Sequence, residues 1–383
     1  MADIQGSCDE GFSAVADALA ANIDSGKDVG ASVAVIKDGE YVVDIWAGDM
    51  VGLDETTRPW EKDTIVNVYS TTKTMTNLSC LILADRGLVD LDAPVATYWP
   101  EFAANGKDAV LVRHLLGHTA GLPGWDEPME TTDLYDWDKC CARLAAQAPW
   151  WEPGTVSGYH AITQGYLVGE VVRRVTGKSL GTFFREELAE PLGADFHIGT
   201  PAECDPRVSR MIPPDAKGGI GSGADQDSVM YRIWSNPAAG PENSWTEGWR
   251  RAEIPAANGH GNARAVARVQ SIVSHGGEID GHRYISEAGI ERIFEQQTFG
   301  EPDLGIGMAL DMGIGYGLIS PRLPLGVTNK GCFWAGLGGS MVVNDLEHRM
   351  TIAYVMNKMQ GRGTTGDSRA ARAVYAAYGM VIG

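Results

Sequence analysis

Apolar residues recur at helical spacing near both ends of the chain. One face of a helix predicted over residues 12–23 carries Phe12, Val15, Leu19 and Ile23. A second helix is predicted over residues 70–86. Gly87 follows it, and glycine is typical of the position after a helix C-terminus. The same spacing predicts further helices over residues 160–175, 179–189 and 368–378.

Two pairs of β-rich runs each flank a short turn. Residues 31–36 and 41–46 flank an Asp-Gly turn, and residues 340–344 and 350–356 flank a turn at 345–348. Consecutive hairpins favour antiparallel pairing, because parallel neighbours need long crossover connections. We therefore expect one antiparallel sheet that contains both hairpins and is covered by the N-terminal and C-terminal helices.

The middle of the chain is rich in Trp, Pro and Gly, and its stretch 212–262 reads as loop. Neither an internal repeat nor a low-complexity linker divides the chain. The pattern indicates an α/β fold of the α+β type and one catalytic unit over residues 1–383. Within it, residues 1–89 and 256–383 are expected to form a sheet-plus-helix subdomain, and residues 90–255 a mostly helical insertion.

The composition is that of a globular protein and excludes several functional classes. Apolar residues make up 44% and charged residues 21% of 383, unlike disordered, collagen-like or coiled-coil chains. There are 31 basic and 50 acidic residues, a net charge of −19. Phosphate backbones and anionic lipids repel such a chain, so we expect no nucleic-acid partner and no membrane partner.

The cysteines and the N-terminus indicate a cytoplasmic protein. Six cysteines are scattered without a C-x-x-C pair, which is typical of free thiols in a reducing compartment. The N-terminus lacks the basic and apolar regions of a secretory signal, and no run of about 18 apolar residues exists.

Ser70-Thr-Thr-Lys73 is the first candidate for chemistry. Positions three apart share a helix face, so the Ser70 hydroxyl would lie beside the Lys73 amine at a helix N-terminus. A hydroxyl is a weak nucleophile that needs a neighbouring base, and a neutral lysine can serve. The alternative is a helix-capping serine and a solvated lysine. Ser70 is the only serine of the chain with a lysine three positions later.

Two later segments add a phenol and a glycine-rich turn. Tyr159 precedes a predicted helix, where its hydroxyl can project into a cleft and move a proton; the alternative, and the commoner role of a single tyrosine, is a half-buried structural residue. The segment from Trp334 through Gly336 to Ser340 reads Trp-Ala-Gly-Leu-Gly-Gly-Ser. Its backbone N–H groups could face a developing oxyanion, or the segment is a tight turn before an edge strand.

Taken together and in this order, these segments resemble the serine β-lactamase and penicillin-binding-protein superfamily. Ser70-Thr-Thr-Lys73 matches its Ser-x-x-Lys motif, Tyr159-His-Ala161 its Tyr-x-Asn motif, and Trp334-Ala-Gly336 its Lys-Thr-Gly motif. The wide spacing from the first motif to the second is similar to the class C branch. The segments 114–122, 190–193 and 338–340 are similar too, so the resemblance covers most of the chain.

The departures from the superfamily motifs indicate an esterase. Ala161 stands where asparagine would bind a substrate amide, and Trp334 replaces a lysine suited to a substrate carboxylate. This version resembles the family VIII carboxylesterases. The resemblance implies a hydrolase that cleaves small-molecule esters of small to medium acyl chains, without a cofactor or metal. The alternatives are an amide hydrolase (β-lactamase, D-peptidase or amide-oligomer hydrolase), an acyltransferase with the same side chains, and an inactive scaffold.

The resemblance also implies a role for each site residue. Ser70 forms an acyl-enzyme, while Lys73 and Tyr159 move the proton, with either of the two as the base. The backbone N–H groups of Ser70 and Leu337 form the oxyanion hole. Trp334 and Gly336 contact the substrate, with the indole lining the acyl or alcohol pocket.

Four other motifs are weaker candidates. Gly177-Lys-Ser179-Leu-Gly181 matches a hydrolase elbow, but the preceding residues are helical in pattern, so Ser179 is predicted to cap a helix. His114 and His118 lack the glutamate of a zinc-protease helix and are expected to hydrogen-bond at a helix end. Ser222 lies in a Gly-Ser-Gly loop, and the segment 258–262 lacks the spacing of a dinucleotide loop.

Overall fold

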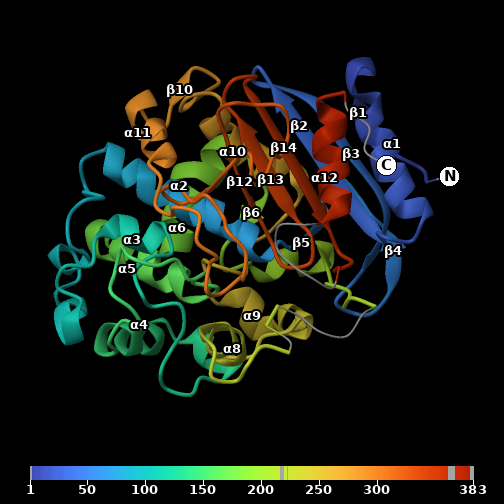
Figure 1. Ribbon diagram of the computed structural model, residues 1–383. Coiled ribbons are helices and arrows are strands. Elements are labelled where there is room, and N and C mark those ends of the chain that lie inside the picture. The colour runs from blue at the N-terminus through green and yellow to red at the C-terminus, as the bar shows by residue number, and fades with distance from the viewer. Residues whose placement is uncertain (1, 216–219, 222, 361–366, 380–383) are drawn as a thin grey trace.

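The computed structural model describes residues 2–215, 220, 221, 223–360 and 367–379. The two predicted hairpins meet at the centre of one sheet (Figure 1). Strand β2 (Gly30–Lys37) pairs with β3 (Glu40–Val51), and β13 (Met341–Asp345) pairs with β14 (Met350–Met356). Because β14 also pairs antiparallel with β2, the two ends of the chain share this sheet, which confirms the predicted fold class.

The described residues give this sheet eight strands in the order β1-β3-β2-β14-β13-β12-β11, with β4 paired to β3. Its outer strands are β1 (Gln5–Cys8), β4 (Thr57–Pro59), β11 (Gly317–Leu318) and β12 (Gly331–Ala335). The turn between β2 and β3 places Asp38 at φ 53° and Gly39 at φ 92°, the left-handed pair that an Asp-Gly hairpin turn requires.

Helices cover both faces of the sheet. Helices α1 (Ser13–Asp24) and α12 (Ser368–Ala377) pack together against β2, β3 and β14, as predicted. Helix α10 (Ala263–Ser274), which we did not predict, packs against β2, β13 and β14 from the opposite side. Every residue from 30 to 36 in β2 is buried, which two covered faces explain.

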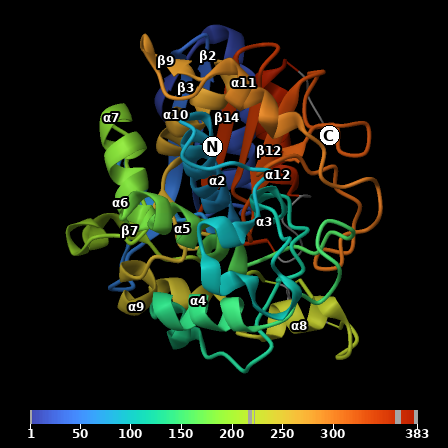
Figure 2. The same cartoon turned by 90° about the vertical axis from the view of Figure 1, so that its left-hand side faces the viewer.

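Helix α2 (Thr72–Asp85) lies between the sheet and the helical part of the molecule. All its residues from 72 to 83 are buried, and it packs against α5, α6, α10 and α11. Helices α3, α4, α8 and α9 lie farther from the sheet (Figure 2). The remaining helices are α3 (Val112–Leu116), α4 (Trp137–Ala146), α5 (Thr163–Thr176), α6 (Leu180–Phe184), α7 (Glu190–Leu192), α8 (Val229–Ser235), α9 (Glu247–Arg251) and α11 (Glu287–Glu291).

Some boundaries differ from the prediction. The helix expected over 179–189 consists of α6 followed by a π-helical turn, Arg185–Ala189. The stretch 212–262, predicted as loop, contains α8 and α9, whose N-termini are capped by the Ser228 and Thr246 side chains. Each of these helices is too short to show a helical period in the sequence. We propose that the sheet-plus-helix subdomain and the helical insertion meet after residues 89 and 255.

A small sheet supports the segment that precedes α2. Strand β5 (Ile65–Asn67) pairs with β8 (His260–Gly261) and with β7 (Val208–Ser209), while β6 (Phe196–His197) pairs with β8. A separate two-stranded ribbon joins β9 (Glu278–Ile279) and β10 (His282–Arg283). No helix among the described residues has the length and apolar character needed to cross a membrane.

Candidate active site

Ser70 lies in a single 3-10 turn, Tyr69–Thr71, between β5 and α2. The turn begins with Tyr69 at φ 45°, a left-handed conformation that is uncommon for a bulky residue. The Thr72 hydroxyl donates to the Tyr69 carbonyl at 2.5 Å and accepts from the Gly259 N–H at 2.9 Å. Ser70 is thereby held at the N-terminal end of α2, where free N–H groups favour negative charge.

Lys73 is one helical turn from Ser70 and is only 1% exposed. Its Nζ donates to the Ser70 hydroxyl at 3.2 Å and to the backbone carbonyls of Ala161 at 2.7 Å and Ala256 at 2.9 Å. These contacts occupy the three N–H directions of an ammonium group. No carboxylate among the described residues forms an ion pair with it. Burial therefore lowers the pKa of Lys73 well below its usual value.

Tyr159 lies in the loop before α5 and is fully buried, with its ring centre 4.8 Å from the Lys73 Nζ. Burial raises the pKa of Tyr159, and this effect outweighs the lowering caused by the nearby Ser70 hydroxyl and Trp334 indole. The phenol hydroxyl makes no hydrogen bond to any of the described residues. The phenol is thus neutral and available as a proton donor.

A neutral aromatic cluster surrounds the phenol. Trp334 on β12 lies 5.6 Å from the Tyr159 ring and stacks on His118 at 5.9 Å, while His118 is 4.8 Å from Tyr159. The His118 Nδ1 accepts from the His160 N–H at 3.1 Å, and burial lowers the pKa of His118 well below its usual value. Trp334 is 2% exposed, and its indole N–H has no partner among the described residues.

The glycine-rich turn after β12 packs directly on the Ser70 turn. A Cβ atom at Gly336 would lie 2.1 Å from the Val68 carbonyl oxygen and 2.3 Å from the Ser340 Oγ, so the site requires glycine. The Ser340 hydroxyl donates to Val68 O at 2.8 Å and bonds the Thr71 hydroxyl at 2.9 Å. These bonds hold the two turns in a fixed relation.

Leu337 follows Gly336 in this turn. Its N–H makes no hydrogen bond within the described part of the chain. The carbonyl of the following residue, Gly338, accepts from the buried Arg369 Nη2 at 2.6 Å and from the Gln360 N–H at 3.0 Å. Arg369 also pairs with Asp28, so these bonds tie the turn to buried residues of the core.

This chain is similar to known proteins along almost its whole length. The Beta-lactamase family model matches residues 15–376, nearly the whole chain. The chain belongs to the beta-lactamase family. It is 37% identical over 368 residues to the esterase/beta-lactamase LipL of Mycobacterium tuberculosis, a match that covers 92% of this chain and 83% of LipL.

Two solved structures are also similar to this beta-lactamase family member over almost their whole length. One is a family VIII carboxylesterase, with 43% identity, a TM-score of 0.90 and coverage of 98% of this chain and 99% of the other. The second is a penicillin-binding protein homolog from Caulobacter crescentus, with 38% identity, a TM-score of 0.89 and the same coverage. Both likenesses confirm the resemblance drawn from the three motifs.

The structure brings the predicted site residues of this beta-lactamase family member together. Ser70, Lys73 and Tyr159 meet at the start of α2, and Trp334 contacts the phenol. The Leu337 N–H lies in the turn that packs on the Ser70 turn. Trp334 is more deeply buried than a residue expected to line the acyl or alcohol pocket, and its ring packs against Tyr159 and His118.

Several residues of the site were not predicted from the sequence. His118 belongs to the segment 114–122 that resembles the superfamily, but its contact with the phenol depends on tertiary packing. The backbone carbonyls of Ala161 and Ala256 accept hydrogen bonds from Lys73. Every residue type has such a carbonyl, so the sequence does not identify these two acceptors. Asp303 accepts a hydrogen bond from the Tyr159 backbone N–H. In the sequence, this aspartate indicates only a turn.

The weaker candidates have structural roles where the structure describes them. Ser179 caps α6 by accepting from the Thr182 N–H, as predicted. The His114 Nδ1 accepts from the Leu111 N–H at the start of α3, also as predicted. Ser222 lies outside the described residues. Among the described residues, no group of three or more metal-binding side chains is present.

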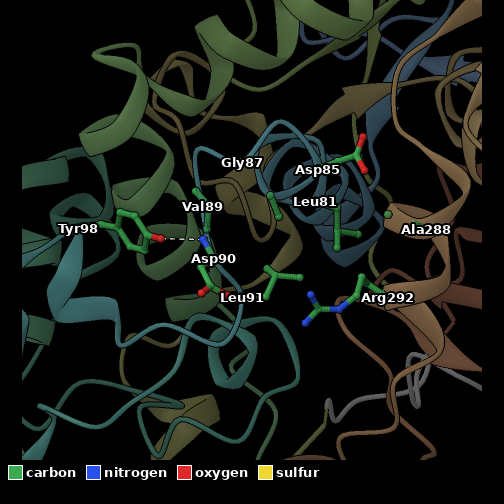
Figure 3. A pocket seen from close by; sticks show the side chains of 11 residues that line it. Leu81, Asp85, Gly87, Val89, Asp90, Leu91, Tyr98, Ala288 and Arg292 are labelled. Carbon is green, nitrogen blue, oxygen red and sulfur yellow. Dashed lines mark hydrogen bonds between the residues drawn. The ribbon is translucent and has the colours of Figure 1, made fainter.

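A separate cavity of about 430 Å³ lies at the C-terminal end of α2, the end remote from Ser70. Figure 3 shows the side chains that line it. Leu81 and Asp85 of α2 line it together with Arg292, and the Tyr98 hydroxyl beside it bonds the Asp90 N–H at 2.6 Å. Helix α2 thus has the candidate active site at its N-terminal end and this cavity at its C-terminal end.

Proposed function

We propose that this protein is a serine carboxylesterase in which Ser70 forms the acyl-enzyme. The observation that carries the proposal is the buried contact between the Ser70 hydroxyl and a lysine that no carboxylate neutralises within the described residues. The names of LipL and of the family VIII carboxylesterase structure support ester hydrolysis. The chain is therefore a serine ester hydrolase of the beta-lactamase family.

Lys73 is the base of the acylation step. Its neutral form has two N–H bonds and one lone pair, and two carbonyls already accept from it. The remaining direction faces Ser70, so the lone pair is aimed at the hydroxyl proton. The lowered pKa of Lys73 favours the neutral amine, whereas the raised pKa of Tyr159 disfavours a phenolate base.

Acylation then proceeds with each proton accounted for. The Ser70 Oγ bonds to the ester carbonyl carbon while its proton passes to the Lys73 Nζ, and the carbonyl oxygen becomes an oxyanion. When the carbonyl re-forms, the bond to the alcohol oxygen breaks. Tyr159 protonates the departing alkoxide and takes a proton from the Lys73 ammonium. The products are the Ser70 ester and the free alcohol.

Deacylation repeats these steps with water. Water attacks the acyl carbon and gives its proton to Lys73, the carbon–Oγ bond breaks, and Ser70 recovers a proton through Tyr159. The backbone N–H groups of Ser70 and Leu337 stabilise the oxyanion in both halves, and the unbonded Leu337 N–H supports this role. The carboxylic acid leaves and the free enzyme is restored.

The preference for esters over β-lactams rests on the neutral surroundings of Tyr159. No cation but Lys73 contacts the phenol among the described residues, and Trp334 fills the position of the motif lysine. A substrate carboxylate would therefore find no ion-pair partner there. The name of LipL also includes beta-lactamase, so amide hydrolysis is the second candidate.

The test is hydrolysis of p-nitrophenyl acetate, butyrate and octanoate beside the β-lactam nitrocefin. We expect turnover of short and medium esters, little nitrocefin cleavage, and loss of ester turnover in Ser70→Ala. The matched control is Ser179→Ala, which alters the other serine motif. Covalent labelling by a fluorophosphonate should map to Ser70. Ester turnover that survives in Ser70→Ala would refute the proposal, and dominant nitrocefin cleavage would favour the amide hydrolase.

We also propose a cytoplasmic location, because all six cysteines are free thiols in the structure. Alkylation of intact cells followed by mass spectrometry tests this proposal. Reduced cysteines in a cytoplasmic fraction are expected, and recovery of the protein outside the cells would contradict it.

A further inference from the structure

Asp303 is a buried carboxylate beside the Tyr159 loop, only 5% exposed. Its Oδ1 accepts from the Tyr159 N–H at 3.0 Å, from the Gly305 N–H at 2.8 Å and from the Ile306 N–H at 3.0 Å. Its Oδ2 accepts from the Ser157 hydroxyl at 2.5 Å. Four donors thus satisfy one buried carboxylate, and two of them belong to the loop that carries the phenol.

The segment after Asp303 also packs against this loop. The Leu304 N–H donates to the Ser157 carbonyl at 2.9 Å, and a Cβ atom at Gly305 would lie only 3.0 Å from the Tyr159 nitrogen. On the other side of the loop, His118 accepts from the Gly158 N–H at 3.1 Å through its carbonyl. The backbone of Tyr159 is therefore clamped between two segments remote in sequence.

This clamp matters because the phenol hydroxyl has no hydrogen-bond partner among the described residues. Without a hydrogen bond at the hydroxyl to a described residue, the position of the side chain depends on its backbone and on its ring contacts with His118 and Trp334. The bond from the Tyr159 N–H to Asp303 is the tether closest to the side chain.

We propose that Asp303 is a positioning residue for the proton donated by Tyr159 to the leaving alkoxide. The inference rests on the proposed function, since it assigns Tyr159 as that donor. Loss of the tether displaces the phenol from the leaving oxygen, and displacements of about 1 Å reduce rates steeply. The Asp303 carboxylate makes no hydrogen bond to Ser70 or Lys73.

The experiment compares two esters of one acid that differ in leaving group, p-nitrophenyl butyrate and ethyl butyrate. Nitrophenolate departs without protonation, whereas ethoxide needs a proton. We measure kcat/KM, which reports the steps through acylation, for wild type, Tyr159→Phe, Asp303→Asn and Asp303→Ala. Circular dichroism and thermal unfolding check that each variant is folded.

The expected result is a loss that depends on the leaving group. Tyr159→Phe and Asp303→Ala should each lower kcat/KM for ethyl butyrate by about 100-fold, and that for p-nitrophenyl butyrate far less. Asp303→Asn keeps one acceptor oxygen but removes the charge. It should also lower kcat/KM for ethyl butyrate more than that for p-nitrophenyl butyrate, but by less than Asp303→Ala does. Should Asp303→Ala not fold, Asp303→Asn alone decides. In Tyr159→Phe/Asp303→Asn, the loss should not exceed that of Tyr159→Phe alone.

Ser157→Ala is the matched control. It removes the bond to the Asp303 Oδ2 and leaves the Tyr159 N–H bond, so its ratio between the two esters should equal that of wild type. Equal losses for both esters in the folded Asp303 variants would overturn the inference, because a merely structural role has that signature. If Tyr159→Phe itself shows no leaving-group selectivity, the proton-donor role in the proposed function fails instead.

Discussion

Gly336→Ala tests whether the contact between the two turns sets the active-site geometry. The added Cβ atom would lie 2.1 Å from the Val68 carbonyl oxygen, more than an ångström inside ordinary van der Waals contact. The obstacle is backbone, so β12 and the Ser70 turn must separate. Overpacking of this kind costs about 1–3 kcal/mol of the free energy of unfolding. A shift of about 1 Å between Ser70 and the Leu337 N–H reduces the rate by about 100-fold.

The assay is kcat/KM for p-nitrophenyl butyrate together with urea unfolding. Gly11→Ala is the matched control, because no atom lies within 4 Å of a Cβ atom at Gly11. This control should keep both the activity and the stability of wild type. A folded Gly336→Ala variant with wild-type kcat/KM would refute the reasoning, since the oxyanion turn could not then depend on this contact.

Three further predictions concern the base, the anchor of the oxyanion turn and the second serine motif. The neutral amine of Lys73 accumulates above its lowered pKa, so kcat/KM should rise with pH until that pKa is passed. Lys73→Arg should lose at least about 100-fold across the pH–rate profile, because a guanidinium group does not deprotonate. Arg369→Met leaves Asp28 and Asp367 buried without their cation and should cost about 3–5 kcal/mol in urea unfolding. Ser179→Ala removes a helix cap and should cost about 1 kcal/mol in the same unfolding assay while ester turnover is unchanged.

The hairpins and the terminal helices were predictable because each carries a local signal. The Asp-Gly turn fixes the first hairpin, and the stripe from Phe12 to Ile23 marks α1. The pairing of β14 with β2 joins segments more than 300 residues apart, and it followed only from the rule that hairpins pair antiparallel. Helix α10 also has a signal, since Asn262 caps it and Val266, Val269 and Val273 recur at helical spacing, yet no helix was predicted there.

In the active site too, the residues that could be predicted are those with a local signal in the sequence. Ser70 and Lys73 are neighbours on one helix, so their contact follows from spacing alone. Tyr159 and Trp334 were each candidates from their own segments. Their grouping with Ser70 came from the family resemblance, because nothing local links residues that far apart in the chain. Asp303 and the Ala256 carbonyl act through the backbone of other segments, and sequence patterns do not record such contacts.

Lys73 serves as the base and Tyr159 as the acid because burial shifts the pKa values of the two groups in opposite directions. Burial disfavours whichever form is charged, so it lowers the pKa of the amine and raises that of the phenol. A cation in place of Trp334 would act on both groups, lowering the phenol pKa and weakening its fixed role as acid. With a neutral indole at this position, the pKa of Lys73 stays lowered and that of Tyr159 stays raised. Two groups whose pKa values are shifted in opposite directions can act as base and acid in one site. Replacement of the motif lysine by tryptophan therefore bears on proton transfer as well as on the charge of the substrate.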